Sequence, residues 1–259
     1  MHVKLKNLLF GLCCLILILT ISCKKELIST PTPKILNIAK KIYPVNNSIN
    51  FSGYQWKVTH SPNKRTAPGS NYWRDNAVWV DEKGYLHLTL TKDPETDKWF
   101  CAEISSEKKF GIGTYQFWVE GRVDQLDKNV VFGLFNYSGI DYYDEIDIEF
   151  SRWGDPKNQN LHYNVYPAEN TTAAIWGSSL EFSLNEPYSI HRITRANSSV
   201  KFESYYDFQG RKIHTQLYSS PNISKKDMPL YINLWAFRSL PPSDQKNVEL
   251  IIQKFVFTE

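Results

Sequence analysis

The residues of this chain best suited to chemistry are three carboxylic acids in a short alternating run. Glu145, Asp147 and Glu149 are separated by single apolar residues, and a Phe follows the last of them. In a β-strand, side chains at positions i, i+2 and i+4 point to the same face. The spacing therefore predicts a strand that presents all three carboxyl groups on one face and turns its apolar residues toward a core.

Three acids on one strand face repel one another, and an ordinary exposed strand gains nothing from that cost. Repulsion and partial burial raise the pKa of a carboxyl group, as a general acid requires. Glu145 and Glu149 are about 13 Å apart along an extended chain at ~3.3 Å per residue, whereas retaining glycosidases hold two carboxyl groups about 5–5.5 Å apart. Long Glu side chains leaning inward on a concave strand would close much of this gap, with the shorter Asp147 between them.

This pattern predicts a nucleophile, an acid/base and an orienting partner on three alternate positions. A solvated acidic strand and a calcium site are the alternatives, although calcium ligands usually come from loops.

The elements that must position these acids are short β-strands. From Phe51 onward, alternating apolar and polar residues form runs that turn residues interrupt, as at 86–91, 115–120, 200–205, 230–235 and 248–252. No helical stripe is evident. Many short strands with regular turns are typical of a sandwich or barrel. We therefore predict one all-β domain over residues 51–259.

Composition agrees with a folded protein of this kind. The chain has 259 residues, is 42% hydrophobic and 22% charged, and carries a formal net charge of +3. These values exclude a disordered chain, a collagen and a multi-span membrane protein, and argue against a strongly basic nucleic-acid binder. Aromatic residues make up 14%. Aromatic rings fill β cores and also line carbohydrate clefts, so composition alone does not separate the two uses.

The amino terminus is typical of an export signal. Two lysines precede an uncharged apolar run from Leu8 to Cys23, which is shorter than the ~20 residues of a spanning helix. The end of the run, with Ser22 before Cys23, resembles the lipobox of bacterial lipoproteins. We predict a signal peptide at 1–22, a lipid on Cys23 and a tether at 23–50, which would anchor the domain to a membrane of the bacterial cell envelope. An uncleaved amino-terminal anchor is the alternative.

Metal and disulfide chemistry is not indicated. Cys101 would be the only free thiol of the mature chain, so we expect a small buried residue rather than a disulfide or a metal ligand. His162, His191 and His214 have no second ligand at metal spacing and are predicted to be turn or core residues. We expect no metal and no cofactor, and the sequence does not indicate a structural calcium.

The segment Asp144–Phe150, DEIDIEF, resembles the signature of glycoside hydrolase family 16. Its spacing matches the unbulged form, similar to lichenases, whereas laminarinases of the family usually have one more residue before the second Glu. Further similarities follow in the family's order over about residues 54–259: Cys101-Ala-Glu103, Phe110–Tyr115, Phe135-Asn-Tyr137 and Tyr231–Trp235.

The resemblance implies a β-jelly roll sandwich with a concave substrate cleft. It implies that Glu145 is the nucleophile, that Glu149 is the acid/base and that Asp147 tunes their charge, in a retaining reaction through a covalent glycosyl-enzyme. It also implies sugar contacts at Glu103, Tyr137, Tyr166, Asn233 and Trp235. We expect Trp73 and Arg74 to form a further subsite wall.

Some residues depart from the lichenase pattern. Tyr143 stands where a Trp is frequent, Ser105 stands where an Arg is frequent, and Arg195 replaces a common Trp. We predict a monomeric, endo-acting retaining hydrolase of a β-linked polysaccharide, with β-1,3/1,4-glucan as substrate. The alternatives are a non-catalytic glycan-binding lipoprotein, a relative acting on galactans such as agar or carrageenan, and a transglycosylase. The complete carboxylate triplet favours an enzyme, and its unbulged spacing disfavours galactans.

Overall fold

The computed structural model describes residues 40–259. The predicted signal peptide, Cys23 and most of the predicted tether lie outside these residues. Before residue 51 the described chain already pairs with the domain: β1 begins at Ser48, and an isolated bridge joins Ile42 to Val80. Residues 42–50, part of the predicted tether, therefore lie against the domain.

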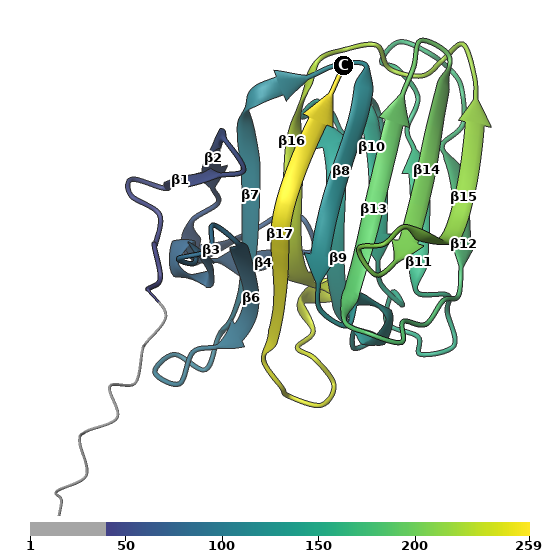
Figure 1. The fold of residues 1–259 in the computed structure, drawn as a ribbon. Helices are drawn as coiled ribbons and strands as arrows, with labels where there is room; N and C mark the ends of the chain where they lie inside the picture. The colour runs from purple at the N-terminus through teal and green to yellow at the C-terminus, as the bar shows by residue number, and fades with distance from the viewer. Residues whose placement is uncertain (1–39) are drawn as a thin grey trace, which may run out of the picture. The chain divides into compact units, whose positions relative to one another are not determined.

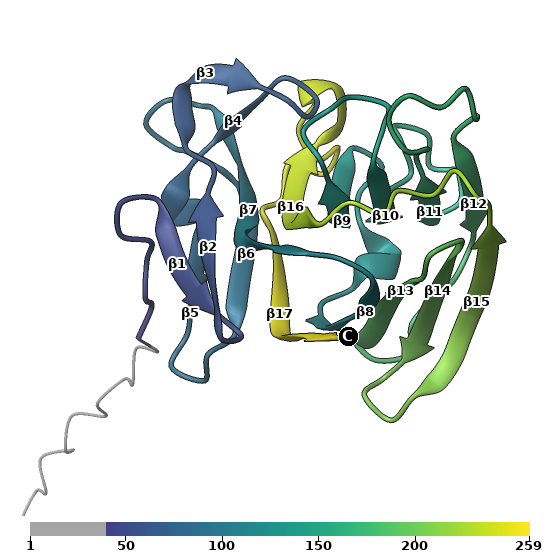
Figure 2. The ribbon, with the colours of Figure 1, turned by 90° about the horizontal axis from the view of Figure 1, so that it is seen from above.

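The described residues form two stacked layers of β-strands (Figures 1 and 2). The layer behind in Figure 1, here the back sheet, has the strand order β1 (Ser48–Phe51), β2 (Tyr54–Val58), β7 (Trp99–Phe110), β16 (Met228–Ala236), β9 (Val130–Tyr137), β10 (Glu145–Phe150), β11 (Leu161–Val165) and β12 (Trp176–Leu180).

The layer in front, here the front sheet, has the order β5 (Val78–Val80), β6 (Leu86–Lys92), β17 (Val248–Thr258), β8 (Gly113–Glu120), β13 (Tyr188–Arg195), β14 (Ser199–Tyr206) and β15 (Arg211–Ser219). Every neighbouring pair in both sheets is antiparallel. β3 (Ser61–Thr66) and β4 (Asn71–Trp73) form a small hairpin beside β7, and β6 pairs with β7 where the two layers join.

Three short 3-10 helices, Asp75–Ala77, Val123–Gln125 and Phe237–Ser239, are the helical elements of the described residues. No helix in the described part of the chain has the length and apolar character needed to cross a membrane. The architecture confirms the prediction of an all-β jelly roll sandwich.

The core between the layers decides which way the acidic strand faces. Ile146, Ile148 and Phe150 of β10 are fully buried, and Phe150 contacts the buried His191 of the front sheet. Burying an apolar side chain of this size stabilises the fold by roughly 1.5–3 kcal/mol. A slip of one residue would exchange these side chains for the acids. Core packing therefore holds the three acids on the outer face of the back sheet.

β10 pairs regularly along its whole length. On β9, Glu145 lies opposite Tyr137 and Phe150 opposite Phe132, with no register shift between them. Pairing with β11 is equally regular. The strand is therefore unbulged, as the sequence spacing predicted.

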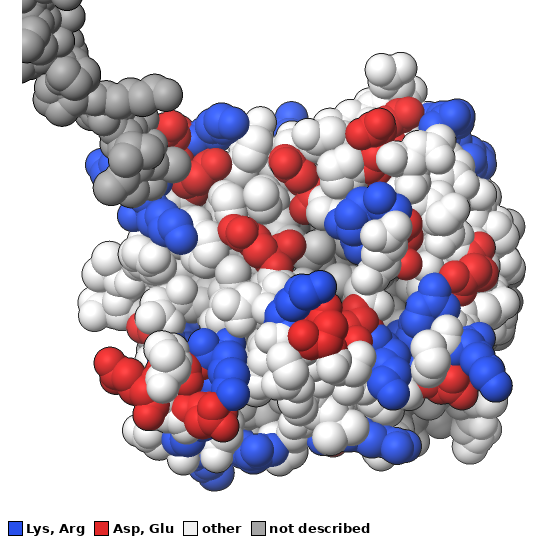
Figure 3. Space-filling model, turned by 90° about the horizontal axis from the view of Figure 1, so that it is seen from below, with Lys and Arg blue, Asp and Glu red and all other residues white. Residues whose placement is uncertain are grey.

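Two further predictions about single residues are confirmed. Cys101 is a free, fully buried thiol. His191 is fully buried between Ser189 and Ser204, and burial lowers its pKa to about 3, so it is a neutral core residue. On the face shown in Figure 3, cationic and anionic side chains are mixed, with neither sign gathered into one large patch.

Candidate active site

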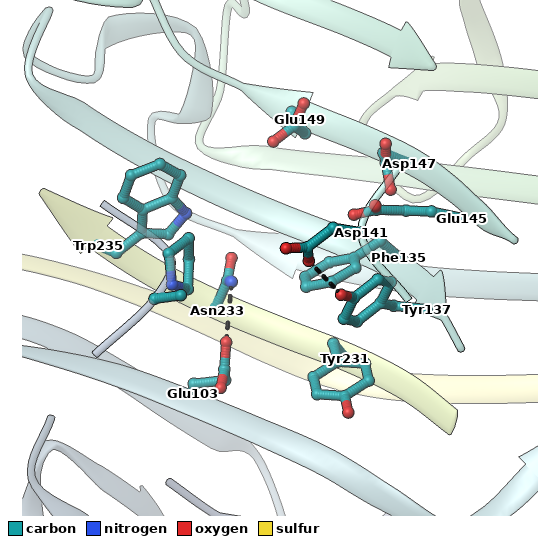
Figure 4. A pocket seen from close by; sticks show the side chains of 12 residues that line it. Glu103, Phe135, Tyr137, Asp141, Glu145, Asp147, Glu149, Tyr231, Asn233 and Trp235 are labelled. Atoms are coloured by element: carbon teal, nitrogen blue, oxygen red, sulfur yellow. Dashed lines mark hydrogen bonds between the residues drawn. The ribbon is translucent and has the colours of Figure 1, made fainter. Parts of the chain in front are cut away.

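A cavity of about 260 Å³ lies on the outer face of the back sheet. Its walls come from four adjacent strands, β7, β16, β9 and β10, together with two loops (Figure 4). The described residues that line it are Ala67, Pro68, Glu103, Phe135, Tyr137, Asp141, Glu145, Asp147, Glu149, Tyr231, Asn233 and Trp235. The structure thus brings the predicted triplet together with four of the predicted sugar contacts.

Strand register explains why residues so distant in sequence meet here. Glu149 lies opposite Gly133 of β9, Gly133 lies opposite Asn233 of β16, and Asn233 lies opposite Glu103 of β7. These four residues form a straight row across four strands. Asp147 begins a second row, which continues through Phe135 and Tyr231. Because all these side chains leave one face of one sheet, register alone assembles the site.

The three carboxyl groups of β10 hold their protons more tightly than free acids do. Burial, and then the charge of Glu149, raise the pKa of Glu145 to about 8. Burial raises the pKa of Glu149 to about 7. Burial and the two neighbouring charges raise the pKa of Asp147 well above its usual range. The triplet therefore does not carry three negative charges at neutral pH.

Neighbouring side chains modify the effect of burial on these acids. Asp147 lowers the pKa of Glu145 and so partly offsets the rise that burial causes, while the charges of Glu145 and Glu149 raise the pKa of Asp147. Asn164 Nδ2 on β11 donates to Glu149 Oε2 at 3.0 Å. Asp147 therefore favours the ionised form of Glu145, whose pKa nevertheless stays raised, and the Asn164 amide favours the ionised form of Glu149.

Glu103 is a second buried acid of the cavity, and burial raises its pKa. Thr59 Oγ1 donates to one of its oxygens at 2.7 Å, and Asn233 Nδ2 donates to the other at 3.1 Å (Figure 4). Asn233 Oδ1 has no hydrogen-bond partner among the described residues. The pairing fixes the orientation of the Asn233 amide and turns its carbonyl oxygen away from Glu103.

Two strand glycines make room for these asparagines. A Cβ atom on Gly133 would lie 2.6 Å from Asn233 Oδ1, and one on Gly177 would lie 3.0 Å from Asn164 Oδ1. A glycine inside a strand often marks the close approach of another group. Here each glycine leaves space for an asparagine that donates to a glutamate of the cavity.

Aromatic rings form the apolar wall of the cavity. Tyr231 stacks on Phe135 with ring centroids 5.1 Å apart, and Tyr137 meets Tyr231 edge-on at 6.1 Å. The Tyr137 hydroxyl donates to Asp141 Oδ1 at 2.6 Å, in the loop between β9 and β10 (Figure 4). Trp235 of β16 lies at the opposite end of the cavity from Tyr137 and Tyr231 (Figure 4). These rings offer apolar surface to the C–H faces of a sugar, while the acids offer acceptors to its hydroxyl groups.

Tyr166 lies beside the triplet but does not line the cavity. Its backbone N–H donates to the Glu145 carbonyl at 2.9 Å, and burial together with the charges of all three acids raises its pKa.

The expected wall of Trp73 and Arg74 is wrong. Trp73 is fully buried in β4, and its indole N–H donates to the Thr66 carbonyl at 3.4 Å. Arg74 binds Asp93 at 2.6 Å and lies over the Phe100 ring. Trp73 belongs to the core and Arg74 is held by Asp93, so neither lines the cavity. Ala67 and Pro68, in the loop just before β4, line it instead.

Sequence reasoning did not find Asn164, Asp141, Gly133 or Gly177. The only local signal was a glycine within a run of strand residues. Such a glycine indicates that another group comes close to the strand, but it does not identify that group. The asparagine and the aspartate become recognisable only once strand order and the loop path are known.

Comparison with known proteins decides the family. Residues 69–246 match the model of the glycosyl hydrolases family 16. The chain belongs to glycosyl hydrolases family 16. The family match therefore agrees with three features of this family 16 glycoside hydrolase: the alternating acids, the unbulged strand and the jelly roll.

Solved structures agree with the family 16 fold. A Bacillus licheniformis beta-glucanase is 21% identical with a TM-score of 0.59, covering 85% of this chain and 98% of its own. A lichenase from a mouse hindgut metagenome is 18% identical with a TM-score of 0.56, covering 85% and 97%. A pseudo beta-1,3-glucanase of Mycobacterium tuberculosis is 15% identical with a TM-score of 0.58, covering 84% and 94%. No curated protein sequence matches the chain.

The raised pKa values make a prediction about stability. The folded-state pKa of Glu145 is raised above the ~4.3 of an unfolded Glu. Burial of its charge therefore costs nothing at low pH, where the group is protonated, and destabilises the fold increasingly as pH rises from about 4.5 through about 8. Glu145→Gln should raise the melting temperature of the family 16 domain at pH 8, by about 2–4 °C for each kcal/mol recovered, and change it little at pH 4.

Thermal unfolding at both pH values, with the exposed Glu95→Gln as control, measures this. An equal change at pH 4 and pH 8 would show that charge burial at Glu145 is not the cause.

The glycine contacts make a prediction about turnover. In Gly133→Ala the new methyl group would displace Asn233 and weaken its hydrogen bond to Glu103. We expect kcat/KM for glycoside hydrolysis to fall by about tenfold or more, since a misplacement near 1 Å costs that much or more. Gly177→Ala, with the looser contact, should lose less. Unchanged kinetics in a folded Gly133→Ala variant would mean that Asn233 does not need its present position.

Proposed function

We propose that this chain is an endo-acting retaining glycoside hydrolase that cleaves neutral β-glucan by double displacement. The observation that carries the proposal is the outer face of β10. There Glu145, Asp147 and Glu149 lie together in a cavity with aromatic walls, and Glu149 accepts a hydrogen bond from Asn164.

In the first displacement, Glu149 donates its proton to the glycosidic oxygen of the leaving sugar. Its pKa of about 7 lets it hold that proton in neutral or mildly acidic solution. The Glu145 carboxylate attacks the anomeric carbon, the glycosidic bond breaks, and a glycosyl ester forms. Asp147 favours the ionised form of Glu145, and the attack proceeds from the fraction of molecules in which Glu145 is ionised while Glu149 keeps its proton.

In the second displacement, Glu149 has become a carboxylate, which the Asn164 amide stabilises. It takes a proton from a water molecule as that water attacks the anomeric carbon. The ester bond to Glu145 breaks and the sugar leaves with its original configuration. Transglycosylation would follow the same path, with a sugar hydroxyl in place of water.

Charge argues for an uncharged polysaccharide. Five of the described residues that line the cavity are acids, and none of these lining residues is Lys or Arg. Sulfate esters and uronic acids would meet only like charge and would lose their hydration without compensation. This disfavours carrageenan among the galactans. Solved structures of the same fold are named as a beta-glucanase and a lichenase, which favours β-glucan.

The position of the cavity supports cleavage within a chain. It lies on the open face of a sheet and extends over four adjacent strands, so a polymer can cross the strands in both directions. We further propose that the protein acts as a monomer at the cell envelope, held by a lipid on Cys23 after removal of residues 1–22.

Substrate choice is tested by reducing-end release from mixed-linkage β-glucan, laminarin, xyloglucan, agarose and carrageenan. We expect release from a neutral β-glucan, none from carrageenan, and a loss of about a thousandfold or more in Glu145→Gln. Preferred cleavage of carrageenan would contradict the charge argument. Binding of a glucan in a retardation gel without any turnover would establish a glycan-binding protein instead.

The two glutamate roles are tested by azide rescue with an activated aryl β-glucoside. In Glu145→Ala, azide should enter the space of the lost carboxylate and give the α-glycosyl azide in one displacement. In Glu149→Ala, the ester should still form and azide should then give the β-glycosyl azide. The fall in activity above about pH 7 should also disappear in Glu149→Ala, because the titrating acid is gone. The β-glycosyl azide from Glu145→Ala and the α-glycosyl azide from Glu149→Ala would show that the two glutamates have the opposite roles.

A further inference from the structure

A buried charge lies directly before the proposed nucleophile. The Asp144 side chain is completely buried, and Oδ2 is its hydrogen-bonded oxygen. It accepts from Lys226 Nζ at 2.7 Å and from the Glu169 backbone N–H at 3.3 Å, while Oδ1 has no partner among the described residues. A buried carboxylate with an unsatisfied oxygen depends strongly on its single cation.

Both the side chain and the backbone of Lys226 are held by hydrogen bonds. Its ammonium group also binds Glu169 Oε2 at 2.7 Å, and both bonds raise its pKa. Its backbone carbonyl accepts from Arg195 Nη2 at 2.8 Å. The fully buried Arg195 guanidinium, on β13 of the front sheet, also donates to the Ser224 carbonyl at 3.3 Å. Arg195 therefore fixes the segment from which Lys226 reaches the back sheet.

Backbone hydrogen bonds near Asp144 also join three segments at the start of β10: the residues around Asp144, around Pro167 and around Asn222. The Asp144 N–H donates to the Pro167 carbonyl at 2.8 Å, and the Ala168 N–H donates to the Asn222 carbonyl at 2.7 Å. Asp144 itself has a positive φ of 51°, which a short polar side chain tolerates better than most. The chain enters β10 through this residue, so its position sets the position of Glu145.

We propose that Lys226 is a positioning residue for Glu145. Through Asp144, its ammonium group fixes the start of β10 and balances the buried charge next to the nucleophile. The inference rests on the proposed role of Glu145. It assigns Lys226, which is nearly half exposed and does not line the cavity, to the catalytic apparatus.

The charges around Glu145 explain why one more would matter. Glu149 and Asp147 of β10 and Asp141 of the preceding loop already act on it, and Tyr137 and Tyr166 face it from β9 and from the end of β11. Glu169 adds a further acid near Asp144. Lys226 is the cation that contacts Asp144. Without it, the Asp144 carboxylate would oppose ionisation of Glu145.

Carboxyl carbon NMR of the full-length protein tests the charge balance without any substrate. Spectra of 13C-Glu protein give the titration midpoint of Glu145, whose signal is identified by its loss in Glu145→Gln. We expect Lys226→Met to raise this midpoint by ~0.5–1 pH unit. Lys226→Arg should keep it near the wild-type value. Lys225→Met, a change at the neighbouring exposed lysine, should leave it unchanged.

The double variant Asp144→Asn with Lys226→Met separates charge from packing. It removes both charges and keeps the side-chain sizes, so the Glu145 midpoint should return toward the wild-type value. No shift in Lys226→Met, or a shift that persists in the double variant, would overturn the proposal. In kinetics, the acidic limb of kcat/KM should move with the NMR midpoint. A shift in NMR without any turnover would leave this inference standing and contradict the proposed function instead.

Discussion

The structure depends on one constraint: three carboxyl groups must share one strand face although they repel one another. The alternation of β10 leaves them no other place, because its apolar positions are fully buried between the sheets. The site resolves the conflict by keeping protons. Burial raises the pKa of all three acids and the neighbouring charges add to this at Glu145 and Asp147, so the triplet keeps protons at neutral pH. The repulsion that costs stability thus favours states in which some of these acids are protonated while another is ionised, as a two-step glycosidase requires.

The surrounding residues can be understood as consequences of that constraint. Each of the two glutamates in the row across the sheet, Glu149 and Glu103, has an asparagine donor, and each asparagine has a glycine opposite it that leaves the necessary space. No cation lines the described cavity, which preserves the raised pKa values. The cation that does approach, Lys226, acts from behind the start of β10 and neutralises Asp144 without entering the cavity.

Much of this could be predicted from the sequence, because a period of two is a local property. The acidic triplet, its unbulged spacing, the all-β fold and the buried Cys101 follow from residues that are close in the chain. Asn164, Asp141 and Lys226 could not be found in this way, since they reach the site through strand order and loop path. Trp73 and Arg74 were misplaced for a related reason. An aromatic residue beside a cation fits a sugar platform and a core contact equally well, and only the neighbours of β4 decide between the two.

The most direct test of the account is to identify the residue that carries the sugar. An activated 2-deoxy-2-fluoro-β-glucoside should trap the glycosyl-enzyme, because the fluorine slows the second displacement more than an activated leaving group slows the first. Peptide mass spectrometry of the trapped protein should find the sugar on Glu145. A label on Glu149 would contradict the assignment of roles. Turnover with inverted configuration and no labelled peptide would contradict double displacement itself.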